Sequence, residues 1–284
     1  MQQGRNKRYA AGILTLLVLG VACATAQVEV RIDGGQIKSI QPAKPLDPVV
    51  DKILTRLEQR EVDDLTARLR WDIESPIEED VIRKFGQVWY KKMDPVAKFR
   101  ARFDRKIVAE PGQLGSGTQR KIDEEHLFDG RWYYLIQHAS KSVSKEEIRK
   151  PGDPTDVYAL GRGAFPLPFG QKKAEIVREF VVRRLAPAVG DPKDSDHLEL
   201  VPRPGTQMAP YYKTMHFWVQ REGKYAGLPI KVRVEKLGGT GKVKNIITVT
   251  FTDIKLNSGL SSSVFNFTVP AGYQVEETPI EPGA

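Results

Sequence analysis

Four histidines are the side chains with the greatest capacity for metal binding or proton transfer: His126, His138, His197 and His216. Their spacing matches no short metal-ligand motif such as His-Glu-x-x-His. The densest polar group is Glu124-Glu125-His126, with Asp129 close behind, and it could bind a metal ion or exchange protons. Because Asp129-Gly130 is a strong turn signal, we interpret this group as a solvated strand end, and we predict no metal site.

Two glycine-rich segments bear a superficial likeness to catalytic motifs. Gly115-Ser116-Gly117 lacks the spacing of the Gly-x-Ser-x-Gly nucleophile elbow. Residues 238–242 read Gly-Gly-Thr-Gly-Lys, but Val243 stands where a phosphate-binding loop requires Ser or Thr. This segment also joins two strand-like runs, so we interpret it as a hairpin turn. The sequence therefore predicts a protein that is not an enzyme and uses no cofactor.

The amino terminus has the pattern of a secretory signal peptide. Basic residues precede the apolar run 10–22, and Ala24-Thr25-Ala26 follows as a small-residue cleavage site. We predict that residues 1–26 are the signal and that the mature chain begins near Gln27, in the periplasm or cell envelope. A retained anchor is the alternative, although the apolar run is short for a membrane span.

Cys23 is the single cysteine of the sequence and lies inside the predicted signal. An outer-membrane lipoprotein with lipidated Cys23 is the less favoured alternative, because Gly20-Val21-Ala22 precedes it. Removing the three basic residues of the signal from the net charge of +8 leaves +5 on the mature chain. This mild, dispersed excess suits anionic lipid or polymer surfaces, and nucleic acid is not an expected partner.

Alternation of apolar and polar residues predicts that most of the mature chain is β-strand. The expected strands are residues 65–73, 81–91, 99–103, 121–128, 131–137, 213–220, 230–235, 247–252 and 265–269. Asp47-Pro48 begins a predicted amphipathic helix over residues 47–59, and a second helix is expected over 172–186. A sheet with one apolar face must be covered. The side chains expected to face the helices are Phe217, Val219, Ile230, Val232, Val249, Phe251 and Phe267.

Four motifs follow one another along the chain: Gly86-Gln87-Val88-Trp89-Tyr90-Lys91-Lys92 with Pro95 and Phe99-Arg100; Asp129-Gly130-Arg131-Trp132-Tyr133-Tyr134; Leu198-Glu199-Leu200-Val201-Pro202-Arg203; and Asn257 with Phe265-Asn266-Phe267 and Pro270-Ala271-Gly272-Tyr273-Gln274-Val275. Their order and spacing resemble the LolA/LolB superfamily of periplasmic lipoprotein carriers and lipid-handling proteins. The segment from Lys91 to Pro95 departs from the carrier pattern, with two additional positions and no arginine.

The resemblance implies an α+β fold, a single curved antiparallel β-sheet that forms an unclosed half-barrel, with helices covering its concave face. It covers one domain over residues 47–277, between a flexible lead-in at 27–46 and a tail at 278–284. It implies a monomer that binds lipid or lipoprotein acyl chains in a hydrophobic cavity, as a lipoprotein carrier does. The alternative is an envelope scaffold or sensor of the same fold that binds a protein partner.

The candidate ligand-binding residues are the large apolar side chains of this cavity: Trp71, Trp89, Phe99, Phe103, Trp132, Phe165, Leu167, Phe169, Phe180, Phe217 and Phe251. The other interpretation of each is a filled core. Residues 161–170 form a segment in which Pro166 and Pro168 forbid regular strand structure while Phe165, Leu167 and Phe169 require cover. We predict that this segment closes the mouth of the cavity, with hinges at its glycines.

Overall fold

The computed structural model describes residues 28–33, 36–42, 45–153, 158 and 169–280. Its strands are β1 (Val28–Asp33), β2 (Gln36–Pro42), β3 (Asp64–Ser75), β4 (Asp80–Lys91), β5 (Lys98–Ala109), β6 (Thr118–Phe128), β7 (Trp132–Gln137), β8 (Ser142–Glu147), β9 (Phe180–Leu185), β10 (Ser195–Pro202), β11 (Tyr212–Gln220), β12 (Pro229–Leu237), β13 (Val243–Leu256) and β14 (Gln274–Thr278). Its helices are α1 (Pro48–Glu58) and α2 (Lys173–Glu179), with short 3-10 turns η1 (Gly223–Tyr225) and η2 (Ser262–Phe265).

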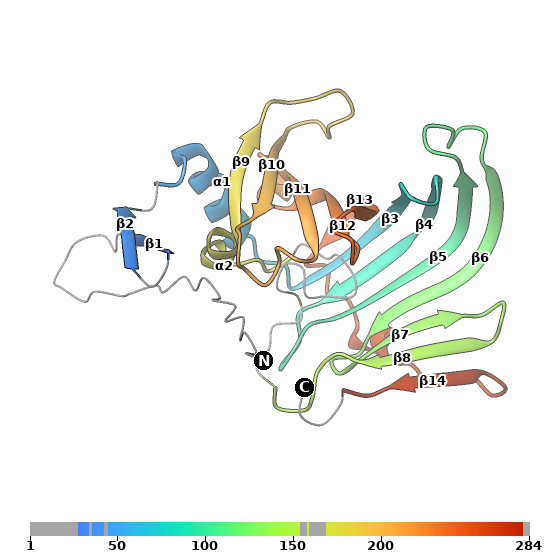
Figure 1. Cartoon of the computed structure of the whole chain (residues 1–284). Helices are drawn as coiled ribbons and strands as arrows, with labels where there is room; N and C mark the ends of the chain where they lie inside the picture. The colour runs from blue at the N-terminus through green and yellow to red at the C-terminus, as the bar shows by residue number, and fades with distance from the viewer. Residues whose placement is uncertain (1–27, 34–35, 43–44, 154–157, 159–168, 281–284) are drawn as a thin grey trace, which may run out of the picture.

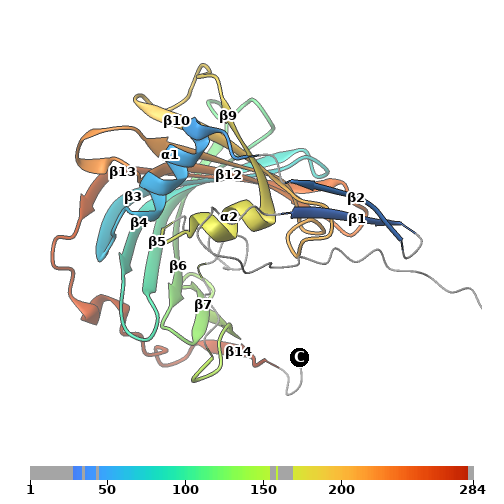
Figure 2. The ribbon, with the colours of Figure 1, turned by 90° about the vertical axis from the view of Figure 1, so that its left-hand side faces the viewer.

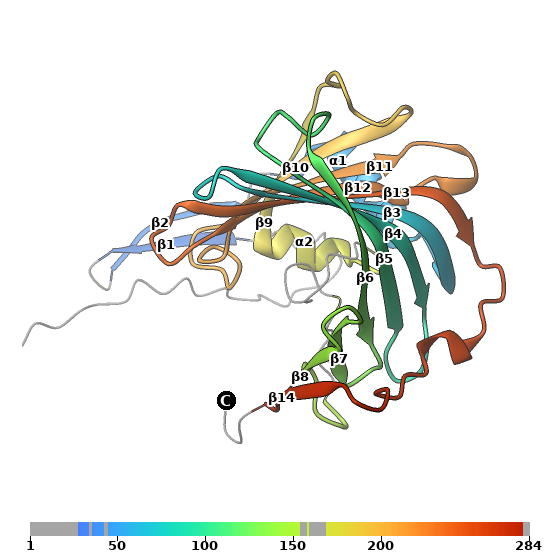
Figure 3. The same ribbon diagram turned by 90° about the vertical axis from the view of Figure 1, so that its right-hand side faces the viewer.

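Twelve of these strands form one sheet in the order β14-β8-β7-β6-β5-β4-β3-β13-β12-β11-β10-β9. The sheet is not closed into a barrel, and it bends around the side on which α1 and α2 lie (Figures 1, 2 and 3). We call that side the concave face and the opposite side the outer face. The predicted α+β fold with a curved, open sheet is confirmed. One pair departs from the antiparallel prediction, because β14 runs parallel to β8.

The first helix was predicted correctly from its cap. The Asp47 carboxylate accepts hydrogen bonds from the amides of Val49 at 2.7 Å and Val50 at 3.2 Å, so it satisfies two free donors of the first turn. The apolar stripe of α1 packs on β9–β12 in one core cluster, through Val50, Ile53, Leu54 and Leu57. Burial of this stripe, rather than helix propensity, is what stabilises so short a helix.

The second helix is shorter than predicted. It ends at Glu179, and residues 180–185 form the edge strand β9. Phe180 and Val182 are buried whereas Val181 between them is exposed, which is the period of a strand. The β-branched pair at 181 and 182 favours this outcome, and the helical prediction over 180–186 was wrong because an extended edge could pair with β10.

Irregular pairing bends the middle of the sheet. The register shifts at Phe85/Gly86 between β4 and β5, at Phe103/Arg105 between β5 and β6, and at Thr252/Lys255 between β13 and β3. Such bulges increase the local twist. Gly86 fits this bend because a Cβ there would lie 2.0 Å from the carbonyl oxygen of Arg102, closer than any side chain tolerates.

The carboxyl-terminal segment crosses the outer face instead of adding the predicted strand at 265–269. Phe265 ends the turn η2 and is buried, and the ring of Phe267 lies 5.4 Å from that of Tyr134 on the outer face. The expectation that Phe267 faces the helices was therefore wrong. Proline at 270 and glycine at 272 end the segment before β14.

The amino-terminal region lies outside the large sheet. β1 and β2 pair as a separate antiparallel hairpin within residues 27–46, the region expected to be a flexible lead-in. The predicted signal at 1–26 lies outside the described residues. Within the ranges that the structure describes, no helix has the length and apolar character needed to cross a membrane.

Candidate functional site

The concave face of β3, β4, β5, β6 and β13 carries a continuous aromatic surface. Side chains alternate along a strand, so the inward positions of neighbouring strands meet. The rings of Trp71 and Phe103 lie 5.6 Å apart, and those of Phe99 and Phe128 lie 6.4 Å apart. These residues belong to one buried cluster with Phe251 of β13. The arrangement gives a large apolar surface suited to an acyl chain.

The segment between β8 and α2 covers this aromatic surface. Phe169 is 2% exposed, and its ring lies 5.5 Å from both Tyr90 and Phe251. The hydroxyl of Tyr158 donates to the carbonyl of Ala97 at 2.8 Å. Gln171, itself buried, donates to the carbonyl of Tyr158 at 2.7 Å. The helices α1 and α2 pack on β9–β12 instead, so the described cover of this half of the concave face comes from Tyr158, Phe169 and Gln171.

The structure divides the predicted ligand-binding residues among several places. Trp71, Phe99, Phe103, Phe169 and Phe251 meet in the aromatic cluster. Phe180 and Phe217 lie in the second cluster, beneath α1 and α2. Phe165 and Leu167 fall outside the described residues. Their role, like that of the others, stays a prediction.

Two predicted residues point to the other side of the sheet. Trp89 lines a hollow of the outer face. Trp132 pairs with Glu147 on β8 and is buried beneath the ammonium of Lys145, which lies 3.8 Å from the ring centroid. Neither can line a cavity on the concave face. The period-two pattern identified their strands. Both faces of these strands carry apolar side chains, however, so the pattern did not indicate which face each tryptophan occupies.

A buried polar network adjoins the aromatic surface and includes part of the predicted solvated strand end. Glu124 accepts from the ammonium of Lys84 at 2.5 Å and contacts Nε2 of His126 at 2.7 Å. Nδ1 of His126 lies 2.5 Å from the hydroxyl of Tyr133. His126 is 5% exposed, and the Lys84 ammonium lies 5.8 Å from the Trp71 ring centroid. The solvated interpretation of Glu124 and His126 was therefore wrong.

Electrostatics fix the protonation states of this network. Burial opposes ionisation of Glu124, but the hydrogen bond from His126 and the positive charge of Lys84 outweigh it and lower its pKa to about 2. Burial lowers the pKa of His126 and raises the pKa of Tyr133. A neutral His126 then donates from Nε2 to Glu124 and accepts from the Tyr133 hydroxyl at Nδ1. The network is a fixed Lys–Glu ion pair braced by a neutral imidazole.

Asp123, Glu125 and His138 offer ligand atoms within 4.8 Å of one another, on the outer face. Arg102 already pairs with Asp123 through two contacts of 3.1 Å, and Arg100 donates to Glu125 at 2.7 Å. Nδ1 of His138 bonds the hydroxyl of Tyr273 at 2.8 Å. These partners neutralise both carboxylates and engage the imidazole, so the group ties the carboxyl-terminal segment to β6 rather than offering a vacant metal site.

The remaining histidines also form a pair. Nε2 of His197 lies 3.0 Å from Nδ1 of His216, and the His197 ring stacks on Trp218 with centroids 4.2 Å apart. Burial lowers the pKa of both imidazoles. Both are therefore neutral at pH 7 and packed on the outer face of β10 and β11.

Glu124→Gln is expected to lower the free energy of unfolding at pH 7 by roughly 2–3 kcal/mol, less than for a fully buried pair because the Lys84 side chain is 15% exposed. The pKa of Glu124 lies below its ordinary 4.5 in the folded state, so its contribution is complete above pH 4.5 and is lost as pH falls toward about 2. Neutral His126 adds a loss that begins below pH 6.5.

Urea unfolding as a function of pH measures this effect. The variant should show a smaller loss of stability than the unmodified protein between pH 4.5 and 2. Glu110→Gln, at an exposed hairpin position, is the control and should retain the original pH profile. Parallel profiles for the unmodified protein and Glu124→Gln would show that the network contributes nothing to folding.

Comparisons with known proteins find no matching protein-family model and no matching curated protein. Among solved structures, an uncharacterized conserved protein from Thermus thermophilus aligns with a TM-score of 0.43 and 12% identity, over 81% of this chain and 99% of the other. A DUF1329 family protein from Desulfovibrio piger aligns with a TM-score of 0.37 and 13% identity, over 78% and 98%. A LolA superfamily protein from Nitrosomonas europaea aligns with a TM-score of 0.33 and 13% identity, over 76% and 97%.

One of these matches is a protein of the superfamily that the sequence motifs resemble. The low TM-scores and identities carry no argument about function. Function must be inferred from the residues of this chain.

Proposed function

We propose that this protein is an exported, non-enzymatic binding protein that holds the acyl chain of a lipid or lipoprotein between its concave face and the segment before α2. One observation carries the proposal: among the described residues, Tyr158 and Phe169 cover the aromatic surface of β3–β6, whereas α1 and α2 pack in the second core cluster. Segments outside regular structure open at lower cost than strands and helices do. An acyl chain could therefore replace the loop.

The energetics of exchange favour such a ligand. Each methylene that leaves water contributes about 0.8 kcal/mol, so a long acyl chain can outweigh the contacts of Phe169 with Tyr90 and Phe251. The displaced aromatic ring needs only to reach another apolar surface. The aromatic surface itself needs no rearrangement, because its residues are held by strands that pair on both sides.

The polar network gives an amphipathic ligand a direction. Lys84 holds a positive charge beside Trp71 and Phe103, with its ammonium 5.8 Å from each ring centroid. The polar head group of an amphipathic ligand would lie beside this network while its chain lies along the aromatic rings.

Tyr158→Phe tests the loop as a cover. Removing the hydroxyl deletes the hydrogen bond to Ala97 and leaves the apolar area of the ring in place. A net contribution of about 1 kcal/mol predicts about fivefold faster uptake of an aliphatic fluorescent probe. Tyr225→Phe is the matched control, because its hydroxyl donates to the carbonyl of Ile254 at 2.6 Å against the same cluster but outside the covering loop. The control should leave the uptake rate unchanged.

Stopped-flow fluorescence gives the rates, and mass spectrometry of the protein purified from its native envelope identifies a bound lipid. No probe uptake and no co-purified lipid would contradict acyl-chain binding and leave the protein-binding scaffold as the function to examine. Equal rates for the two tyrosine variants would show that the ligand does not enter beneath the loop.

A further inference from the structure

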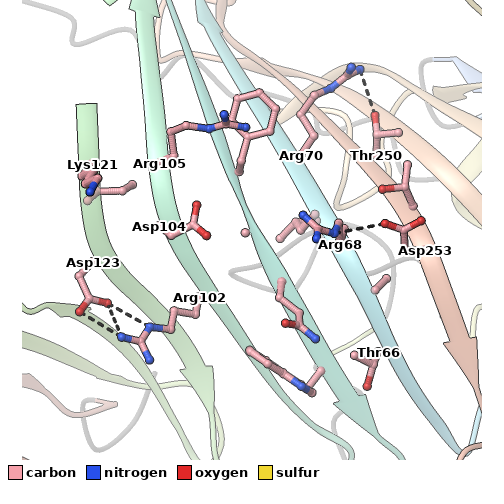
Figure 4. A pocket seen from close by; sticks show the side chains of 18 of the residues that line it. Thr66, Arg68, Arg70, Arg102, Asp104, Arg105, Lys121, Asp123, Thr250 and Asp253 are labelled. Carbon is pink, nitrogen blue, oxygen red and sulfur yellow. Dashed lines mark hydrogen bonds and ion pairs between the residues drawn. The ribbon is translucent and has the colours of Figure 1, made fainter. Parts of the chain in front are cut away.

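The outer face of the sheet carries a second potential binding site, unrelated to the concave face. A hollow of about 1280 Å³ crosses β13, β3, β4, β5 and β6, and side chains of these strands line it (Figure 4). One row of cross-strand partners runs across the hollow from β13 to β6 and consists of Thr250, Arg70, Phe85, Arg105 and Lys121. The register shifts of these strands fall along the hollow, so the bulges that bend the sheet also shape this site.

Positive charge predominates in the hollow. Its lining includes six cationic and three acidic side chains: Arg68, Arg70, Arg102, Arg105, Lys121 and Lys255, with Asp104, Asp123 and Asp253. Arg68 pairs with Asp253 at 3.2 Å, and Arg102 pairs with Asp123. Among the described residues, Arg105, Lys121 and Lys255 form no ion pair with a carboxylate. These three cations are available to a ligand.

Two aromatic side chains lie among the charges. The guanidinium of Arg105 lies 4.1 Å from the centroid of the Phe85 ring, which holds the cation over the hollow. Trp89 lines the next part of the hollow and is only partly buried. Aromatic faces beside separated cations suit a ligand that has flat, weakly polar surfaces as well as regularly spaced negative charges.

We propose that this hollow binds an acidic polysaccharide, whose sugar rings would pack on Trp89 and Phe85 while their carboxylates pair with Arg105, Lys121 and Lys255. Two other polyanions are the alternatives. An acidic peptide could add a strand only beside the part of β6 that precedes Glu124, which pairs with β5 but not with β7, and there it would not reach Trp89 of β4. A flat anionic bilayer cannot follow a hollow surface, whereas a single sugar chain can lie across the strands.

Titration calorimetry with a short oligogalacturonate tests the proposal at about 0.15 M salt, where distant surface charges are largely screened. The variant is Arg105→Gln/Lys121→Gln. The matched control is Lys106→Gln/Arg120→Gln, because Lys106 and Arg120 are the next cross-strand pair of β5 and β6 and point to the other face. Both double variants lose the same net charge. Circular dichroism and thermal unfolding confirm that each remains folded.

The hollow variant should bind oligogalacturonate about tenfold more weakly, which corresponds to about 1.4 kcal/mol, while the control stays within about twofold. Trp89→Leu should also weaken the sugar but leave any residual binding of a polyglutamate peptide unchanged, since only the sugar would pack on the indole. A neutral malto-oligosaccharide of equal length should not bind measurably.

Three results would overturn the proposal. The first is no binding of oligogalacturonate by the unmodified protein. The second is equal weakening in both double variants, which would reflect net charge alone. The third is binding of polyglutamate or of anionic vesicles at least as tight as that of the sugar at matched charge.

Discussion

Phe251→Ala is expected to lower the free energy of unfolding by about 3–5 kcal/mol, the cost of a large-to-small change in a packed core. Phe251 is 4% exposed and lies on β13 at the centre of the sheet, where its ring meets Phe169 at 5.5 Å. Deleting the ring removes packing from the strand and from the covering loop together. Urea unfolding at neutral pH measures the loss.

Thr252→Ala is the control for this variant. Thr252 follows directly on the same strand but is exposed on the outer face, so its replacement should change stability by less than about 0.5 kcal/mol. A loss under about 1 kcal/mol for Phe251→Ala would show that the ring borders a vacant space instead of a filled one. The same measurement therefore reports how far the concave face is packed without a ligand.

Asp64→Ala is expected to lower the free energy of unfolding by about 3–4 kcal/mol, because a buried carboxylate that accepts four hydrogen bonds would be lost. The carboxylate accepts from the amides of Ser258, Gly259 and Leu260 and from the Ser258 hydroxyl, at 2.9–3.1 Å. Burial opposes ionisation of Asp64, yet these donors outweigh it and lower its pKa. The carboxylate thereby fixes the turn by which the chain leaves β13 for the outer face.

Limited proteolysis together with thermal unfolding would detect this effect. The variant should be cleaved more rapidly between residues 257 and 273, because the turn that anchors this segment is lost. Asp63→Ala, at the exposed position directly before Asp64, should behave as the unmodified protein does. Equal cleavage and stability in the two variants would mean that the pairing of β14 with β8 anchors the segment without the turn.

The strands were predictable because their burial alternates: Leu65, Ala67 and Leu69 are buried while Arg68 between them is exposed. The helix at 47–59 was predictable because Asp47-Pro48 is a local cap signal. The start of β9 was not predictable, because a short apolar run directly after a helix is too short for its periodicity to distinguish a strand from a continued helix. The turn η2 was missed because Phe265 and Phe267 alternate like a strand although they pack on an outer face.

The aromatic part of the candidate site was predicted in part, since Trp71, Phe103 and Phe251 occupy inward positions of identifiable strands. The polar network was not predicted, because Lys84 and Glu124 lie 40 residues apart in the sequence and meet only through the register of β4, β5 and β6. The two bulges that set this register have no signal in the sequence apart from Gly86. The outer hollow depends on the same bulges, so its cations could be counted from the sequence but not brought together.

The position of β13 has a consequence for how the chain acquires its structure. β3 to β8 pair in chain order, as do β9 to β13, and the two series join only where β13 pairs with β3, for example Val249 with Trp71. The paired residues of β3 and β13 are far apart in the sequence, and contacts between such distant residues slow folding. A nascent chain that ends before Val243 holds two half-sheets with no means of joining, and each half then exposes a central strand as an edge. Completion of the sheet must therefore wait for nearly the whole polypeptide, which favours a chain kept unfolded until synthesis, and any transport across a membrane, is complete.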